Sequence, residues 1–223
     1  MLSFFKYFER FMYRHPKKVL YFLSAFFPML IMLVVWAIIG LYPFGNRSLM
    51  SVDFGQQYVS FFGLLKNSVL SGDFSNLSYS FTQSLGGPMA GLVGYYLLSP
   101  FNLIFIITPF QLYGLAVFLI IWLRYGAIGL SFAFLLIKRY KGLSSKKYLV
   151  PLLSTAYALS GLLVAYQMNV IFYDAMIMLP IVITYLEELL DGGRGIKYSL
   201  LLGMMLFFQF YMGYMVSIFI VLY

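Results

Sequence analysis

The chain has 223 residues, of which 62% are hydrophobic and 21% aromatic, and only 10% are charged. Soluble chains carry roughly 25% charged residues, so this apolar surface needs lipid as its solvent, and a soluble globular domain is excluded. The absence of cysteine excludes disulfides, thiolate metal sites and a cysteine nucleophile. The formal net charge is +8, but the basic residues gather beside apolar segments, which indicates membrane topology and argues against a nucleic-acid partner.

The first part of the chain predicts a surface helix followed by a membrane span. Residues 1–18 are basic and aromatic, with apolar residues at helical spacing, a pattern typical of an amphipathic helix on a membrane surface. Residues 19–41 carry no charge and are long enough to cross roughly 30 Å of hydrocarbon. Lys17 and Lys18 precede this span, so we expect the N-terminus to be cytoplasmic.

Residues 42–111 predict an external loop that contains helices. Apolar and aromatic residues from Phe54 to Val69 fall on one face of a helix. Gly86-Gly87-Pro88 predicts a turn. The apolar run between Pro100 and Pro109 is too short to cross a bilayer, so we interpret it as an interfacial or re-entrant helix.

Four further spans are predicted, at residues 112–137, 148–169, 170–190 and 198–223. Basic residues at 138–147 follow the second span and place its end on the same side as the N-terminus. The predicted fold class is therefore all-α, a polytopic membrane helical bundle of about five spans that forms a single transmembrane domain over residues 1–223. Because the chain stops directly after an apolar run, we expect it to be part of a longer protein.

Three carboxylates lie on the predicted external side. Asp53 precedes the loop helix, and with Gln56 three residues later it resembles a capping box, but it is equally a candidate functional carboxylate. The two roles compete, because a carboxylate that holds backbone amides is a weak proton acceptor. Asp73 follows Ser71-Gly72 and is interpreted as a turn residue. Asp174 lies between apolar residues near a membrane surface, where it either anchors the chain in headgroup water or faces a cavity or partner.

Arg124 lies about midway along the predicted span 112–137. A guanidinium at that depth costs at least ~2.5 kcal/mol on insertion, so it must face the bundle, pair with a carboxylate or bind an anion. Two alternatives remain open, a functional anion site and a structural ion pair. For the first, a lipid phosphate is the natural partner, since arginine binds phosphate in a bidentate manner.

The order of several short motifs resembles the bacterial YfhO family of polytopic membrane proteins. A basic N-terminus and one span are followed by Asp53 with Gln56-Gln57-Tyr58, by Gly-Gly-Pro and by YYLLSPFN. A charged residue in the next span, an Asp-Ala-x-x-x-Leu-Pro segment and the closing FYMGYM complete the pattern, which covers residues 10–223. The family pattern has asparagine where this chain has Gln209, and family members are several times longer.

The resemblance implies a fold similar to GT-C glycosyltransferases, which use a lipid-phosphate sugar donor at the outer face of the bacterial cell membrane. It implies that Asp53 and Asp174 are catalytic carboxylates, with a divalent cation, Mg²⁺ or Mn²⁺, as a possible cofactor at Asp53. The donor would be a polyprenyl-phosphate sugar and the acceptor a cell-envelope glycopolymer such as a teichoic acid. The remaining motif residues would bind substrate or membrane lipid: Arg124, Gln56, Gln57, Tyr58, Asn102, Gln209 and Tyr211.

A second class of function stays open. The intramembrane Arg124, together with helices interrupted at Pro28 and Pro180, fits a lipid or solute transporter equally well. A non-catalytic partner of an envelope-assembly enzyme is a further alternative. A transporter would accumulate substrate in vesicles without transferring sugar.

Overall fold

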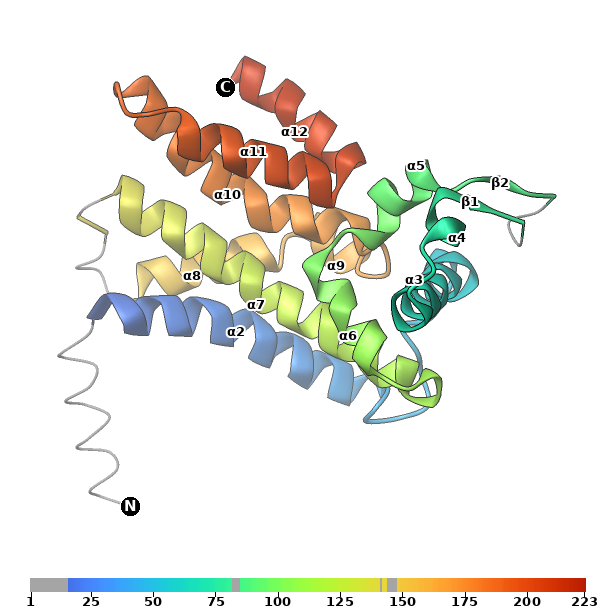
Figure 1. The fold of residues 1–223 in the computed structure, drawn as a ribbon. Coiled ribbons are helices and arrows are strands. Elements are labelled where there is room, and N and C mark those ends of the chain that lie inside the picture. The colour runs from blue at the N-terminus through green and yellow to red at the C-terminus, as the bar shows by residue number, and fades with distance from the viewer. Residues whose placement is uncertain (1–15, 82–84, 141, 144–147) are drawn as a thin grey trace.

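The computed structural model describes residues 16–81, 85–140, 142–143 and 148–223. The surface helix predicted at residues 1–18 lies almost entirely outside this part of the chain, as do three of the lysines at 138–147. The described residues form an all-helical bundle, together with a hairpin of two very short strands, which confirms the predicted fold class (Figure 1).

The bundle is built around α7 (Tyr113–Arg139), which packs most extensively against three other helices. They are α2 (Pro16–Ile38), α8 (Leu149–Ala158) and α10 (Ile171–Leu190). Figure 1 shows the start of α2 and the end of α7 at the same end of the bundle. The basic residues that begin α2 and end α7 therefore share one end, as the charge pattern predicted, and the cytoplasmic orientation of that end stays a prediction.

Two glycines allow α2 and α7 to approach closely. A side chain at Gly126 would overlap Met29, and one at Gly129 would overlap the carbonyl oxygen of Ser24. Small residues at such contacts let helix backbones pack directly, which is the usual source of helix association in lipid. The Trp122 indole nitrogen also donates a hydrogen bond of 2.9 Å to the carbonyl of Met29 across this interface.

The predicted external loop begins with a helix, as expected, although its first turn is unusual. The π-helix η1 (Phe54–Tyr58) leads directly into α3 (Val59–Ser71), and Gly72, with φ +72°, ends the helix. Phe54, Tyr58 and Phe62 of the predicted apolar face are buried, whereas Val69 at its end is exposed. The ring of Phe62 stacks on that of Phe105 with centroids 4.1 Å apart. The Lys66 ammonium donates to the carbonyl of Thr108 and lies 4.9 Å from the centre of the Phe110 ring.

The loop continues through several short elements. Strand β1 (Tyr79–Ser80) pairs antiparallel with β2 (Gly87–Pro88), so Gly87 and Pro88 of the predicted turn lie in a strand, and Gly86, with φ +101°, directly precedes it. The other elements are α4 (Ser75–Ser78), α5 (Ala90–Leu92), the π-helix η2 (Val93–Leu97), the 3-10 helix η3 (Pro100–Asn102), α6 (Leu103–Ile107) and the 3-10 helix η4 (Phe110–Leu112).

The segments Ala90–Leu97 and Pro100–Ile107 are bent against each other by 86°. This geometry is that of a re-entrant loop or of a broken span, and the prediction of an interfacial or re-entrant helix is compatible with it. Within the described residues, α2 and Phe110–Arg139 are long and apolar enough to cross a membrane, and the bent pair would be a third such element if it counts as one span. The number of five spans therefore stays a prediction.

The prediction of a single span over residues 198–223 was wrong. The structure has α11 (Ile196–Phe208) and α12 (Phe210–Leu222), which fold back on each other at Gln209 (Figure 1). The close approach depends on Gly213, where an added Cβ would lie 3.1 Å from the Cα of Leu206. The hydroxyl of Tyr223 donates a 2.7 Å hydrogen bond to Glu187, so the chain returns to the end where α10 finishes.

The segment 148–169 is also not one helix. It consists of α8 and the short α9 (Gly161–Ala165), separated by Leu159 and Ser160. Residues 170–190, in contrast, form the continuous helix α10 as predicted, with Pro180 inside it.

Candidate functional site

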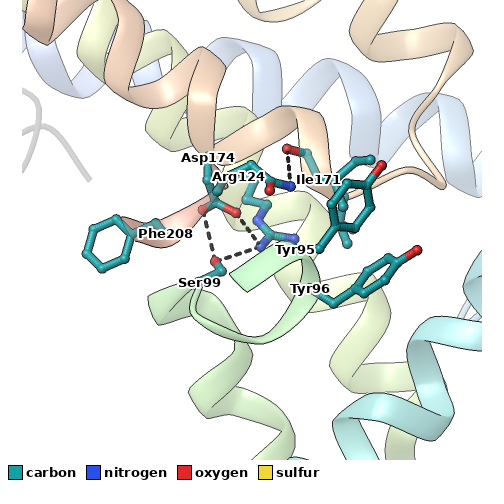
Figure 2. Close-up of a pocket in the computed structure, with 9 residues that line it drawn as sticks. Tyr95, Tyr96, Ser99, Arg124, Ile171, Asp174 and Phe208 are labelled. Atoms are coloured by element: carbon teal, nitrogen blue, oxygen red, sulfur yellow. Dashed lines mark hydrogen bonds and ion pairs between the residues drawn. The ribbon is translucent and has the colours of Figure 1, made fainter. Parts of the chain in front are cut away.

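The centre of the site is an ion pair between Arg124 on α7 and Asp174 in the first turn of α10 (Figure 2). The Arg124 Nη2 atom donates to Asp174 Oδ2 at 3.0 Å and to Ser99 Oγ at 2.8 Å. The Ser99 hydroxyl in turn donates to Asp174 Oδ1 at 2.9 Å. Arg124 is 1% exposed and Asp174 6%, so Asp174 faces a partner in the bundle and does not anchor the chain in headgroup water. The structural ion pair considered for Arg124 is present.

The SPFN motif supplies one side of this arrangement residue by residue. Ser99 links both charged groups and also accepts a 3.4 Å hydrogen bond from the amide of Phe101, while Pro100 occupies the first position of η3. The Phe101 ring lies 5.1 Å from the guanidinium carbon of Arg124, within the range of a cation–π contact. Asn102 donates through Nδ2 to the carbonyl of Tyr96 at 2.7 Å, which ties η2 to η3. The motif is therefore a helix junction built against Arg124.

Gln209 completes the site from the break between α11 and α12. Its Nε2 donates to the carbonyl of Ile171 at 3.0 Å, at the start of α10, and the residue is 2% exposed. Its Oε1 is buried and has no hydrogen-bond partner among the described residues. The Nε and Nη1 atoms of Arg124 are also buried and have no hydrogen-bond partner among the described residues.

These groups line a small cavity of about 10 Å³, which is roughly the volume that one water molecule needs. Figure 2 shows the guanidinium of Arg124 between the Asp174–Ser99 pair and the tyrosine side of the cavity. The lining residues come from η2, the start of η3, α7, the start of α10 and the break between α11 and α12. They are Tyr95, Tyr96, Ser99, Arg124, Val170, Ile171, Asp174, Phe208 and Gln209. Helix ends and buried polar groups thus meet in one place.

Asp53 does not line this cavity, and it is not a helix cap. The residue is half-buried, and its side chain makes no capping hydrogen bond, so the capping-box interpretation was wrong. The preceding Val52 has φ +52°, a conformation that is a genuine outlier for a β-branched residue. Strained backbone and π-helical turns such as η1 are both concentrated at functional sites.

Tyrosine rings connect the surroundings of Asp53 with the cavity. The rings of Tyr58 and Tyr96 have centroids 4.8 Å apart, those of Tyr95 and Tyr96 4.6 Å, and those of Tyr95 and Tyr211 5.5 Å. We call these four residues the tyrosine cluster. Burial, followed by the proximity of Tyr96 and Asp53, raises the pKa of Tyr58, so its phenol stays protonated and donates to Asn169 Oδ1 at 3.3 Å.

The structure separates the predicted site residues into two neighbouring groups. Arg124, Asp174 and Gln209 line the cavity. Gln57, whose Oε1 accepts a 3.4 Å hydrogen bond from the Tyr96 hydroxyl, belongs with Tyr58 and Tyr211 at the tyrosine cluster.

Two other predicted residues stand apart. Gln56 is exposed, and no hydrogen bond, ring contact or ion pair of its side chain is found among the described residues. Asn102 is buried, but it does not line the cavity and serves the helix junction instead. The described residues contain no group of three or more histidines or carboxylates able to hold a metal.

The sequence interpretation missed Ser99, Tyr95 and Tyr96. All three lie in the segment YYLLSPFN, in which the sequence interpretation gave a role to Asn102 alone. A serine directly before proline is a helix-start signal, which could have identified Ser99 as a capping residue. A local signal of this kind contains no information about the hydrogen bond from Ser99 to Asp174 on α10, 75 residues further along the chain.

Comparisons with known proteins agree with the motif order. No curated protein and no solved structure matches this chain. The profile of one family, described as bacterial membrane protein YfhO, matches residues 24–223, which is most of the chain. The chain therefore belongs to the YfhO family of bacterial membrane proteins.

Proposed function

We propose that the protein is a membrane glycosyltransferase that moves a sugar from a polyprenyl-phosphate donor to a cell-envelope glycopolymer, such as a teichoic acid, at the outer face of the membrane. The observation that carries the proposal is the state of Asp53. Its carboxylate holds no helix amide, follows the strained Val52, and lies beside the tyrosine cluster. A carboxylate in this state is available to an acceptor hydroxyl.

In the proposed reaction, Asp53 takes the proton of the acceptor hydroxyl as the oxygen attacks the anomeric carbon of the donor sugar. The bond from the anomeric carbon to the phosphate oxygen breaks, and the lipid phosphate leaves with its electron pair. General base catalysis of this kind contributes about 10²–10⁴-fold. A divalent cation, if bound at Asp53, would supply charge stabilisation for the leaving phosphate.

Asp174 receives a different role in this proposal from Asp53. Both of its oxygens already accept hydrogen bonds, from Ser99 and from Arg124. Asp174 is 6% exposed and already paired within the bundle, so it is not presented to an acceptor hydroxyl. We therefore assign Asp174 as a positioning residue, which holds Arg124 beneath the tyrosine cluster, and keep Asp53 as the catalytic base.

The test is Asp53→Asn in the complete protein, with sugar transfer to the envelope polymer as the readout. We expect a loss of at least about 10²-fold in transfer rate at normal expression. Asp73→Asn is the matched control, because Asp73 is an exposed turn acid in the same loop, where its Oδ1 accepts a 2.9 Å hydrogen bond from the Ser75 amide. Unchanged transfer by Asp53→Asn would remove Asp53 from the reaction.

Transport of a lipid or solute is a second candidate. The observation that favours it is the meeting of broken helices at a buried ion pair, an arrangement found at the binding sites of secondary transporters. Accumulation of substrate in vesicles by the complete protein, without any sugar transfer, would support transport and contradict the proposed reaction.

A further inference from the structure

Two residues that line the cavity have hydrogen-bond donors and an acceptor without partners. Arg124 presents N–H donors at Nε and Nη1, and Gln209 presents an acceptor at Oε1, and all three atoms are buried without a partner among the described residues. Leaving such groups unpaired costs about 1–3 kcal/mol each, so the cavity favours an occupant that satisfies them. A group that both accepts and donates hydrogen bonds, such as a hydroxyl, matches these donors and this acceptor.

Charge and size decide between a hydroxyl and an anion. The positive charge of Arg124 is balanced by Asp174 at 3.0 Å, and no other lining residue is charged. A phosphate placed here would lie beside the Asp174 carboxylate, and two anions in a buried site repel each other strongly. The volume of about 10 Å³ admits a group of the size of water but not a phosphate.

The wall of the cavity is suited to the remainder of a sugar. Tyr95 and Tyr96 line it, and the cluster continues to Tyr211, which is 40% exposed. Tyrosine combines an apolar ring face with a polar hydroxyl, so it can pack against the C–H face of a pyranose and bond to its edge. Ligand sites commonly combine apolar walls with a few placed polar groups, as this one does.

From these observations we propose that the cavity is a subsite for one ring hydroxyl of a pyranose, with Arg124 donating to that hydroxyl, Gln209 Oε1 accepting from it, and Tyr95 and Tyr96 packing against the ring. The proposal rests on the proposed function, since it identifies the bound sugar as the one that is transferred. It also assigns Arg124 to the neutral part of the substrate instead of to its phosphate.

The experiment measures sugar binding separately from transfer. The complete protein in nanodiscs is titrated with D-glucose, D-galactose, D-mannose and N-acetyl-D-glucosamine, observed by saturation-transfer NMR. We expect one of them to bind, and one of its monodeoxy analogues to bind about tenfold more weakly, because a site built for a hydroxyl rejects the analogue without it. Gln209→Leu should weaken binding of the full sugar to a similar extent, and the two losses should not add.

Two further variants keep the test independent of folding. Gln209→Asn keeps a neutral side-chain amide on a shorter arm, so it should preserve more discrimination against the deoxy sugar than Gln209→Leu does. Tyr214→Ala is the matched control on α12, because Tyr214 is 59% exposed and does not line the cavity, and binding should be unchanged. If Gln209→Leu does not fold, the test uses the deoxy series with the wild-type protein and with Gln209→Asn.

The outcomes also separate this inference from the proposed function. If no pyranose binds, or if every deoxy analogue binds as well as its parent, the cavity holds a structural water only and the inference is overturned. Hydroxyl discrimination without any sugar transfer would support the subsite and contradict the glycosyltransferase. Sugar transfer that is indifferent to Gln209→Leu would support the glycosyltransferase and contradict the subsite.

Discussion

The α2–α7 interface and the surroundings of Arg124 solve the problem of burial in opposite ways. Along α2 and α7 both helices are continuous, and Gly126 and Gly129 bring their backbones together. Around Arg124 the helices break, and polar side chains donate hydrogen bonds to backbone carbonyls near the breaks. Asn102 donates to the carbonyl of Tyr96, and Gln209 donates to that of Ile171. Lipid permits unpaired backbone groups at neither place, so the helix breaks around Arg124 depend on polar side chains.

The largest expected effect is at the ion pair. Asp174→Ala leaves Arg124 buried without its counter-charge, and we expect a loss of about 3–5 kcal/mol in the free energy of unfolding. Detergent-unfolding curves of the purified protein measure it. The double variant Arg124→Met, Asp174→Leu should recover most of that loss, and a double variant as unstable as the single one would show that the charge is not the cause.

The continuous interface should respond to volume instead of charge. Gly129→Leu forces α2 and α7 apart at Ser24, and we expect a loss of about 1–3 kcal/mol from overpacking. The matched control is Gly203→Ala on α11, since an added Cβ there meets nothing within 4 Å. Equal unfolding midpoints for the two variants would contradict close backbone packing at Gly129.

Ser99→Ala tests the junction from the loop side. It removes the hydroxyl that links Arg124 and Asp174 but leaves their ion pair in place, so we expect a smaller loss of about 1–2 kcal/mol. The loss should largely disappear in the background of the double variant at Arg124 and Asp174, because no charged partners remain. An undiminished loss in that background would show that Ser99 acts mainly as the cap of η3.

The smallest effect on stability is expected at Asp53. Because its side chain makes no capping hydrogen bond, Asp53→Asn should change the free energy of unfolding by no more than about 0.5 kcal/mol. Measuring stability on the same preparation used for sugar transfer separates a chemical role from a structural one. Asp53→Ala tests the cap itself, because asparagine caps a helix about as well as aspartate, and a loss near ~1 kcal/mol in Asp53→Ala would restore the capping interpretation.

The membrane class, the continuous helices and the charged candidates followed from local properties of the sequence. Unbroken apolar runs predicted α2, α7 and α10, and the cost of a charge in lipid singled out Arg124 and Asp174 as residues in need of partners. The helix breaks within 148–169 and 198–223 were not predictable in the same way. Residues such as Gln209 are compatible with a continuous helix, and the chain bends there because α12 packs back on α11 at Gly213.

By itself, the sequence determined that the chain is a helical membrane protein with a small set of polar residues that lipid cannot leave unpaired. The tertiary structure decided which of them meet. Arg124 pairs with Asp174, 50 residues away in the sequence, and donates a hydrogen bond to Ser99 from the loop. The side chain of Asp53 makes no capping hydrogen bond, although the neighbouring sequence resembles a capping box. The physical reason is that hydropathy and helix propensity act over a few turns, whereas pairing of buried polar groups depends on where distant helices begin and end.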